Sequence, residues 1–275
     1  MFIWRQAGGE SDARATTARR RAFRERREMS QNIQTIEDLF ALLHELKDYP
    51  DGVLPTPTIL PGTGFFPGAL GIWNPQPTEN AHRPPVGGIM VVGHNFDSEA
   101  GFARSHLRPG ENMRGPTWRN LLAFLRSVNI APEQCFFTNA YVGLVAGNSA
   151  VGAFPGARDP AFVRWCQRFL LKQFELMRPQ LVLTLGSYAP QFLAHLSPEL
   201  HTAWLRVSQL KSLDQQGTGL VYPVTIEGMP HPAAAVALTH PAYRPLNVRI
   251  RRYGEFEGEA AEQAMVCDAM TKVGL

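Results

Sequence analysis

Short apolar runs that alternate with longer helical patterns constrain the fold of this chain more than any other feature. Runs with the length and composition of buried strands are residues 87–93, 134–140, 180–186 and 234–240. Segments with helical spacing of apolar residues are 117–128, 160–177, 188–196 and 259–273. Such alternation is typical of a mainly parallel sheet with helices on both faces. We therefore predict a single-domain, three-layer α/β/α fold.

Each predicted strand is followed by polar or glycine-containing residues. These strand exits are Gly93 to Asp97, Thr138 to Tyr141, Gly186 to Tyr188, and Thr239 to Arg244. In open parallel sheets the ligand site lies beyond the carboxyl ends of the strands. We therefore expect the four exits to meet at one edge of the sheet and to form the functional site there.

Taken together and in this order, the exits resemble the uracil-DNA glycosylase superfamily over most of residues 87–253. In that family a glycine-led loop after the first strand holds the attacking water, and the motif GHNFD places Asn95 at that position. FFTN puts Asn139 where the family reads the base, and THPAYRPLN matches the late His-Pro loop with His240. The resemblance implies a uracil-DNA glycosylase-like fold and an enzyme that flips a base out of DNA and hydrolyses its N-glycosidic bond.

The chemistry of that reaction suits these residue types. Breaking the bond builds positive charge on the sugar and negative charge on the leaving base. His240 could donate a hydrogen bond to the base, for which a neutral imidazole is sufficient. Asn95 could hold the water, and Asp97, a stronger base, competes for that role. Both also suit a simple turn, because Asn and Asp often bind their own backbone after a strand.

Residues of the first two exits are expected to complete the base pocket. The amide of Asn139 can pair with uracil or, turned over, with cytosine. Gly93 and His94 are candidates for substrate contact, and Phe96 and Tyr141 are candidates for stacking on the extruded base. Core packing is the expected role of Phe137, on the second predicted strand.

The first loop departs from the family pattern in a way that bears on the substrate. Phe96 replaces the usual proline, and Asp97 stands where the uracil-specific branch has a tyrosine that rejects thymine. A carboxylate there could accept hydrogen bonds from a hydroxylated C5 substituent. The substrate is therefore either uracil or a hydroxymethylated or glucosylated cytosine of phage DNA, which would indicate antiviral defence. A protein that only binds damaged or single-stranded DNA is the alternative of a different class.

Several residues are candidates for contact with the DNA strand. Tyr243 or Arg244, directly after the His-Pro loop, could fill the gap that a flipped base leaves in the stack. Positive charge gathers beside that loop in Arg244, Arg249, Arg251 and Arg252. Further candidates are Ser187 and, around the Gly115-Pro116 turn, Arg114 and Arg119. An ordinary solvated charged face is the competing explanation for these arginines.

Charge is distributed unevenly along the 275 residues. Residues 1–28 hold eight Arg and four Asp or Glu, so the remainder has a net charge of −1 within the total of +3. Residues 1–29 are predicted to be a disordered Arg-rich arm, with Met29 as an alternative start, and residues 30–275 the catalytic domain. A capping-box-like Thr35 to Asp38 begins the first predicted helix. Because the body is nearly neutral, charge alone does not indicate DNA.

Composition excludes several other classes of protein. Cys135, Cys166 and Cys267 are isolated, which fits neither a disulfide framework, a zinc site nor a four-cysteine iron–sulfur cluster, so we expect buried thiols. Neither a signal-peptide pattern nor an apolar run of the roughly 20 residues needed to span a bilayer is present, which favours the cytoplasm. GxxxxGK[ST] and GxGxxG motifs are absent. We expect DNA as the partner, no membrane, no cofactor or metal, and a monomer.

Overall fold

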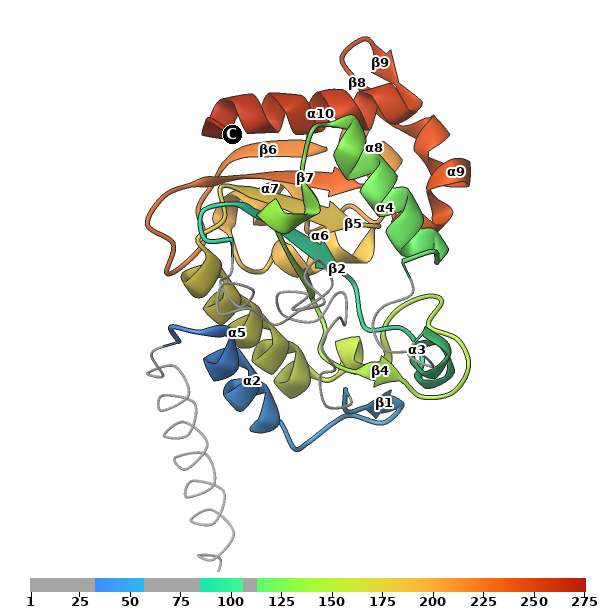
Figure 1. Cartoon of the computed structure of the whole chain (residues 1–275), viewed down its shortest axis with the longest axis vertical. Helices are drawn as coiled ribbons and strands as arrows, with labels where there is room; N and C mark the ends of the chain where they lie inside the picture. The colour runs from blue at the N-terminus through green and yellow to red at the C-terminus, as the bar shows by residue number, and fades with distance from the viewer. Residues whose placement is uncertain (1–32, 57–84, 106–112) are drawn as a thin grey trace, which may run out of the picture. The chain divides into compact units, whose positions relative to one another are not determined.

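A five-stranded sheet forms the centre of the structure, a computed structural model that describes residues 33–56, 85–105 and 113–275. Its strands are β2 (Ile89–Gly93), β3 (Cys135–Asn139), β5 (Leu181–Leu185), β6 (Leu220–Val224) and β7 (Ala233–Leu238). The strand order is β3-β2-β5-β7-β6, with the first four parallel and β6 antiparallel to β7 (Figure 1). The four predicted strands and the mainly parallel sheet are thereby confirmed. The sequence analysis missed β6, an edge strand that contains Pro223, where a missing N–H is tolerated.

Helices surround the sheet. They are α2 (Ile36–His44), α3 (Glu99–Ser105), α4 (Pro116–Ser127), α5 (Pro160–Met177), α6 (Tyr188–Leu193), α7 (Pro198–Trp204), α8 (Leu210–Gln215), α9 (Arg244–Asn247) and α10 (Gly258–Val273). Local sequence sets their starts. Thr35 and Asp38 form the predicted capping box of α2, and the Asp159 carboxylate accepts from the backbone N–H groups of Ala161 and Phe162 at the start of α5.

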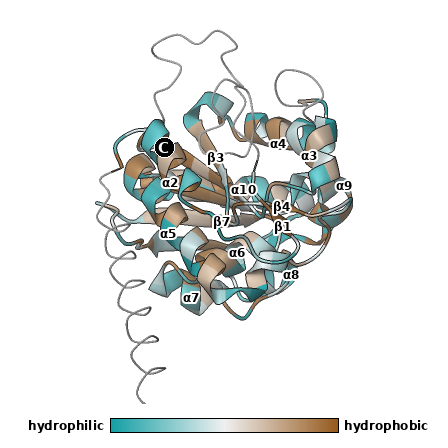
Figure 2. Cartoon of the chain, turned by 90° about the horizontal axis from the view of Figure 1, so that it is seen from below, coloured by the Kyte–Doolittle hydropathy of each residue, from teal (hydrophilic) through white to brown (hydrophobic). Residues whose placement is uncertain are grey.

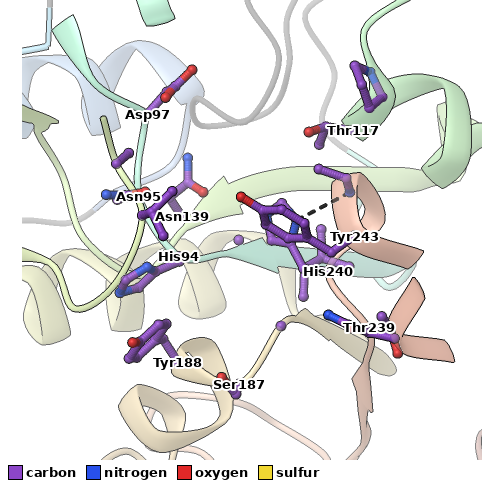
Figure 3. Close-up of a pocket in the computed structure, with 18 of the residues that line it drawn as sticks. His94, Asn95, Asp97, Thr117, Asn139, Ser187, Tyr188, Thr239, His240 and Tyr243 are labelled. Carbon is purple, nitrogen blue, oxygen red and sulfur yellow. Dashed lines mark hydrogen bonds between the residues drawn. The ribbon is translucent and has the colours of Figure 1, made fainter. Parts of the chain in front are cut away.

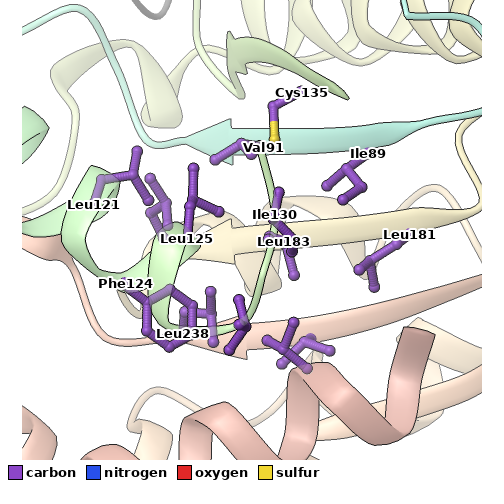
Figure 4. Close-up of a cluster of buried hydrophobic side chains, with 14 of the residues drawn as sticks. Ile89, Val91, Leu121, Phe124, Leu125, Ile130, Cys135, Leu181, Leu183 and Leu238 are labelled. Carbon is purple, nitrogen blue, oxygen red and sulfur yellow. The ribbon is translucent and has the colours of Figure 1, made fainter. Parts of the chain in front are cut away.

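Helices cover the sheet on both faces, which confirms the three-layer prediction. On one face, α4 and α10 pack against the strands; Figure 4 shows part of this core, which includes Ile89, Val91, Leu121, Phe124, Leu125, Leu183 and Leu238. On the other face, α5 reaches β3, where the Thr138 hydroxyl donates to Oε1 of Gln173 at 2.6 Å. Figure 2 shows the strands as an apolar layer between helices whose outer sides are more hydrophilic. All five residues of β2, β3 and β5 are buried, as two covered faces require.

A second, two-stranded sheet supports the loop after β2. Its strands, β1 (Val53–Leu54) and β4 (Leu144–Val145), are antiparallel. Val145 also bridges Ser98, and its N–H donates to the carbonyl of Asp97 at 3.0 Å. The segment before the main sheet therefore helps to fix the first strand exit.

The predictions for the N-terminal arm and for the three cysteines have different outcomes. The proposed arm, residues 1–29, lies outside the described residues; Thr35–Leu275 form one compact unit. Cys135 and Cys166 are buried as expected, but Cys267 is exposed on α10, because the buried side of that helix is formed by residues such as Met265 and Ala269. Within the described residues, no helix has the length and apolar character to cross a membrane, and no cluster of three His, Cys, Asp or Glu could hold a metal.

Candidate functional site

A cavity of about 1090 Å³ lies at the carboxyl ends of β2, β3, β5 and β7. Asn95, Asn139 and His240 all line it, although they are separated by up to 145 positions in the chain. Figure 3 shows these side chains with the neighbouring Ser187 and Tyr188. The structure therefore brings together the groups that the four strand exits were expected to contribute.

The register between β2 and β3 places the strand ends that carry Asn95 and Asn139 side by side. Gly93 lies opposite Asn139, and its carbonyl accepts from the N–H of Ala140 at 2.9 Å. One step further, the His94 carbonyl accepts from the N–H of Tyr141 at 3.0 Å. Because the ladder continues past the strand ends, Asn95, just after β2, and the buried Asn139, the last residue of β3, enter the cavity side by side.

The exits of β5 and β7 approach each other in the same way. The N–H of Gly186 donates to the Leu238 carbonyl at 2.8 Å. Gly186 has φ +80°, and a Cβ at this position would lie 3.3 Å from Cβ of His240. Glycine is suited here because it adopts positive φ without strain and lets Ser187 enter the cavity wall beside His240.

Asn95 carries an unsatisfied polar atom. Its side-chain Nδ2 is buried and has no hydrogen-bond partner among the residues that the structure describes. Leaving a buried donor unpaired costs about 1–3 kcal/mol. Such a group at a cavity wall is suited to an acceptor that arrives with a ligand or a water.

Asp97 is engaged in the turn rather than in the cavity centre. It has φ +84°, and its Oδ1 accepts from the N–H of Ser98 at 2.7 Å. Gly101 leaves room for this carboxylate, since a Cβ there would lie 2.2 Å from Oδ2 of Asp97. In Figure 3 the carboxylate points away from Asn139 and His240. This geometry favours the turn interpretation for Asp97. Asp97 is nevertheless part of the cavity lining, and its competition with Asn95 for the water stays a prediction.

His94 forms a polar part of the cavity wall. Its ring stacks on Tyr188, with centroids 4.5 Å apart and an interplanar angle of 14°, as Figure 3 shows. Burial, with a further contribution from the nearby His240, lowers the pKa of His94 to about 4. The imidazole is therefore neutral at pH 7. Tyr188 was not among the predicted site residues, although it follows Ser187 in the third strand exit.

Tyr141 supports the cavity from behind and lies outside its lining. Its ring meets His94 edge-on at 5.6 Å, stacks on Phe154 at 5.0 Å and contacts Phe192 at 4.8 Å. Burial raises the pKa of the Tyr141 phenol to about 12. The ring of Tyr141 therefore packs against His94, Phe154 and Phe192, which gives no support to its predicted stacking on a base. The other stacking candidate, Phe96, does line the cavity.

Phe137 packs in the core as expected, and a second histidine near the sheet lies away from the cavity. Phe137 is fully buried and packs edge-on against Trp118 at 5.1 Å. His231, which precedes a proline as His240 does, lies before β7 begins, at the end of the strand opposite the cavity. His240 is therefore the histidine at the carboxyl edge of the sheet.

Hydrogen bonding assigns a donor atom on His240. Its Nδ1 accepts from the N–H of Ala242 at 3.3 Å, at the start of the 3₁₀ turn Pro241–Tyr243. Burial lowers the pKa of His240 and so favours the neutral ring. A neutral imidazole with Nδ1 as acceptor carries its proton on Nε2. His240 can therefore donate a hydrogen bond from Nε2 without being charged.

Two of the arginines predicted to contact phosphate are buried. Arg244 is 6% exposed and Arg251 0%, and both form ion pairs with Glu262. This burial gives no support to Arg244 as a wedge or to either arginine as a phosphate ligand, although Arg251 is part of the cavity lining. The shared partner, Glu262, lies on the C-terminal helix α10, and the sequence does not reveal which residues this helix contacts. Among the others, Arg249, Arg252, Arg114 and Arg119 are exposed.

Exposed apolar side chains project from the loop after His240. Tyr243 is 49% exposed, Leu246 65% and Ile250 49%, and Tyr243 and Ile250 line the cavity. Tyr243 was a predicted DNA contact, whereas Leu246 and Ile250 were missed. The available signal was their apolar character within an otherwise Arg-rich segment.

A mainly parallel sheet whose strand exits surround one cavity defines an α/β protein with its ligand site at the carboxyl edge. Comparison with family models extends this result: the model of the uracil DNA glycosylase superfamily matches residues 76–257. The chain belongs to the uracil DNA glycosylase superfamily, whose members are generally DNA glycosylases and whose fold implies DNA binding. No match was found among curated proteins.

Proposed function

We propose that this protein is a monofunctional DNA glycosylase that extrudes a pyrimidine and hydrolyses its N-glycosidic bond. The observation that carries the proposal is the convergence of Asn95, Asn139 and His240 from three strand exits on one cavity. Nδ2 of Asn95, which has no hydrogen-bond partner within the described residues, adds a polar group suited to an acceptor. Extrusion is necessary because the reacting bond is not accessible inside a duplex, and it costs a few kcal/mol.

Each of the three residues has a distinct role in the proposed reaction. Asn139 pairs with the edge of the extruded base. Asn95 holds a water whose oxygen bonds to the sugar carbon C1′ as the bond from that carbon to the base breaks. The base leaves with the electron pair, and His240 stabilises the developing charge by donating from Nε2. The products are the free base and an abasic site, and the water proton passes to solvent or to the base.

Residues around the mouth of the cavity are proposed to hold the DNA strand. Tyr243, Leu246 and Ile250 are suited to fill the space that the extruded base leaves in the stack. Arg249 and Arg114 are exposed and replace the buried arginines as candidates for phosphate contact. Ser187 lines the cavity and is a further candidate for contact with the strand.

Uracil and a C5-modified cytosine remain the two candidate bases. The cavity, at about 1090 Å³, is slightly larger than the range of roughly 300–1,000 Å³ for sites that hold drug-sized ligands. That size favours room for a hydroxymethyl or glucosyl substituent. The orientation of Asp97, however, gives no support to a carboxylate that binds the hydroxyl groups of this substituent. We therefore place uracil first and the modified cytosine second.

A panel of oligonucleotides tests the proposal. The full chain is incubated with single- and double-stranded DNA that carries U, T, hydroxymethylcytosine or glucosylated hydroxymethylcytosine, and free base and alkali-labile sites are measured. Release of uracil alone supports the repair function, and release of a modified cytosine supports action on phage DNA. Retarded DNA without alkali-labile sites on any substrate would overturn the enzymatic proposal and support a protein that only binds DNA.

A further inference from the structure

Glu262, on α10, is a buried carboxylate directly behind the His240 loop. It is 0% exposed, and its Oε1 accepts from both the N–H and the hydroxyl of Thr239, at 2.6 and 2.7 Å. Its two oxygens also form ion pairs with Arg244 and Arg251. One side chain therefore holds the residue before His240 and two residues after it.

Arg251 extends this network to a second carboxylate and to the sheet. Its Nε and Nη2 donate to Asp214 of α8 at 2.8 and 2.9 Å, and its Nη1 donates to the Ala237 carbonyl of β7 at 2.8 Å. Burial alone would lower the pKa of Arg251, but its hydrogen bond and charge interactions with Asp214 and Glu262 raise that pKa. Arg251 is therefore held as a cation inside the protein.

Helix α4 holds the same loop from the other side. Nδ2 of Asn120 donates to the Pro241 carbonyl at 2.8 Å. The guanidinium of Arg244 lies over the ring of Phe124, 4.1 Å from its centroid. Residues 239, 241, 244 and 251 are thus anchored to the protein body, while Tyr243, Leu246 and Ile250 between them are exposed.

The energetics of buried ion pairs indicate that the contacts of Glu262 serve positioning more than stability. Desolvation offsets most of the attraction within such a pair, so a buried ion pair is weak evidence for added stability. Removing one partner, in contrast, leaves an uncompensated buried charge. A carboxylate that binds two arginines and a backbone N–H fixes the relative positions of all three, and such geometric precision is what a catalytic donor requires.

We propose that Glu262 is a positioning residue for His240, and that its charge sets the place of the imidazole in the cavity. The inference rests on the proposed glycosylase function and adds a residue outside the cavity lining to it. Glu262 does not touch the substrate and acts only through the ends of the His240 loop.

Glu262→Gln is the first test, because it keeps the size and one acceptor of the side chain and removes its charge. On a DNA substrate whose base the wild-type protein removes, the single-turnover excision rate should fall about 10- to 100-fold, and DNA affinity should change little. Glu259→Gln is the matched control: Glu259 contacts the same Arg244 at 3.4 Å, but its side chain is 55% exposed. The control should keep the wild-type rate. Equal losses in both variants would overturn the proposal.

A double-mutant cycle separates positioning from general support of the fold. If Glu262 acts through His240, then Glu262→Gln should cause no further loss of rate when His240→Ala is already present. An equal loss in the two backgrounds would show that Glu262 acts independently of His240 and would overturn the proposal. Should Glu262→Gln fail to fold, Thr239→Val removes one hydrogen bond to Glu262 and leaves the ion pairs in place. We expect the same non-additivity from it, with a smaller loss.

An NMR measurement distinguishes failure of this inference from failure of the proposed function. The imidazole resonances of His240, assigned with His240→Ala, should shift in Glu262→Gln and stay unchanged in Glu259→Gln. This result is expected even if the protein excises none of the bases tested, which would overturn the function alone. Unchanged His240 resonances in a folded Glu262→Gln variant would overturn the positioning role.

Discussion

The two histidines at the cavity show how burial selects a protonation state for a single residue. For His94, burial and the neighbouring His240 lower the pKa to about 4, and the stack on Tyr188 and the edge contact with Tyr141 hold the neutral ring in place. A neutral His94 adds no positive charge to its part of the cavity wall at pH 7. In the proposed reaction, stabilisation of the leaving base then depends on the Nε2 donor of His240 rather than on a positively charged His94.

This burial leads to a prediction about stability and pH. Between pH 6.5, the ordinary pKa of histidine, and pH 4, His94 binds a proton in the unfolded chain but not in the folded one. The free energy of unfolding should therefore fall as the pH drops through this window, by up to about 1.4 kcal/mol for each unit between the two pKa values. His94→Gln should reduce the decrease in Tm between pH 7 and pH 5, as measured by calorimetry. An identical decrease in both proteins would contradict the prediction.

Asn139 gives the second prediction at this scale. Removing its amide leaves the base without a polar partner, so Asn139→Ala should lower the excision rate on the order of 100-fold. DNA affinity should change little, because contacts to phosphates supply most of it. Single-turnover rates and fluorescence anisotropy on the same oligonucleotide measure the two quantities. If rate and affinity fell together by the same factor, Asn139 would have no specific role in reading the base.

At the scale of elements, the segment after His240 combines a fixed interior with an exposed apolar surface. It consists of η3 (Pro241–Tyr243), α9 and η4 (Val248–Ile250). Arg244 and Arg251 are fixed to Glu262, whereas Leu246 is 65% exposed. A rigid base beneath an apolar tip suits insertion into a base stack, since little conformational freedom is lost on contact.

Leu246→Ala should therefore reduce excision from duplex DNA more than from single-stranded DNA, where no stack has to be refilled. The ratio of the two rates is the measurement, and a several-fold decrease is expected from unstacking costs of a few kcal/mol. Tyr222→Ala provides the control, because Tyr222 is 43% exposed on the edge strand β6 and lies outside the cavity lining. Equal effects on both DNA forms would exclude a wedge role for Leu246.

Sequence patterns predicted the elements well where local signals were sufficient. Alternating apolar runs located four parallel strands, and the polar strand exits located Asn95, Asn139 and His240. Burial of individual side chains was not predictable in the same way. In the sequence, Arg244 and Arg251 have the character of phosphate ligands. In the structure, both pair with Glu262, which lies 11 positions beyond Arg251.

Tyr141 illustrates the same limit for an aromatic residue. It is the last residue of the second strand exit, where a base-stacking residue was expected, but its ring packs against Phe154 and Phe192. Those partners lie on segments whose positions depend on the whole fold. Asp97 differs, because its own backbone, at φ +84°, turns the carboxylate toward Ser98. In each case, tertiary or turn geometry sets the contacts of a side chain, which residue type alone left open.

At the scale of the whole molecule, every described site residue lies within the compact unit Thr35–Leu275. Residues 1–28 contribute four net positive charges, and the rest of the chain has a net charge of −1. Any contact of the predicted arm with DNA would therefore be electrostatic and would weaken with salt. Such contacts raise affinity without placing any group at the reacting bond.

Deleting residues 1–29 should consequently leave Tm and the single-turnover excision rate at saturating protein unchanged. Affinity for DNA should become weaker at low salt and converge with that of the full chain as salt rises, because arm contacts release counterions from the DNA. Calorimetry, excision assays and anisotropy titrations over a salt series measure the three quantities. A lower Tm, or a slower rate at saturation, would show that the arm supports the fold or the site, in contradiction to a catalytic unit that begins after it.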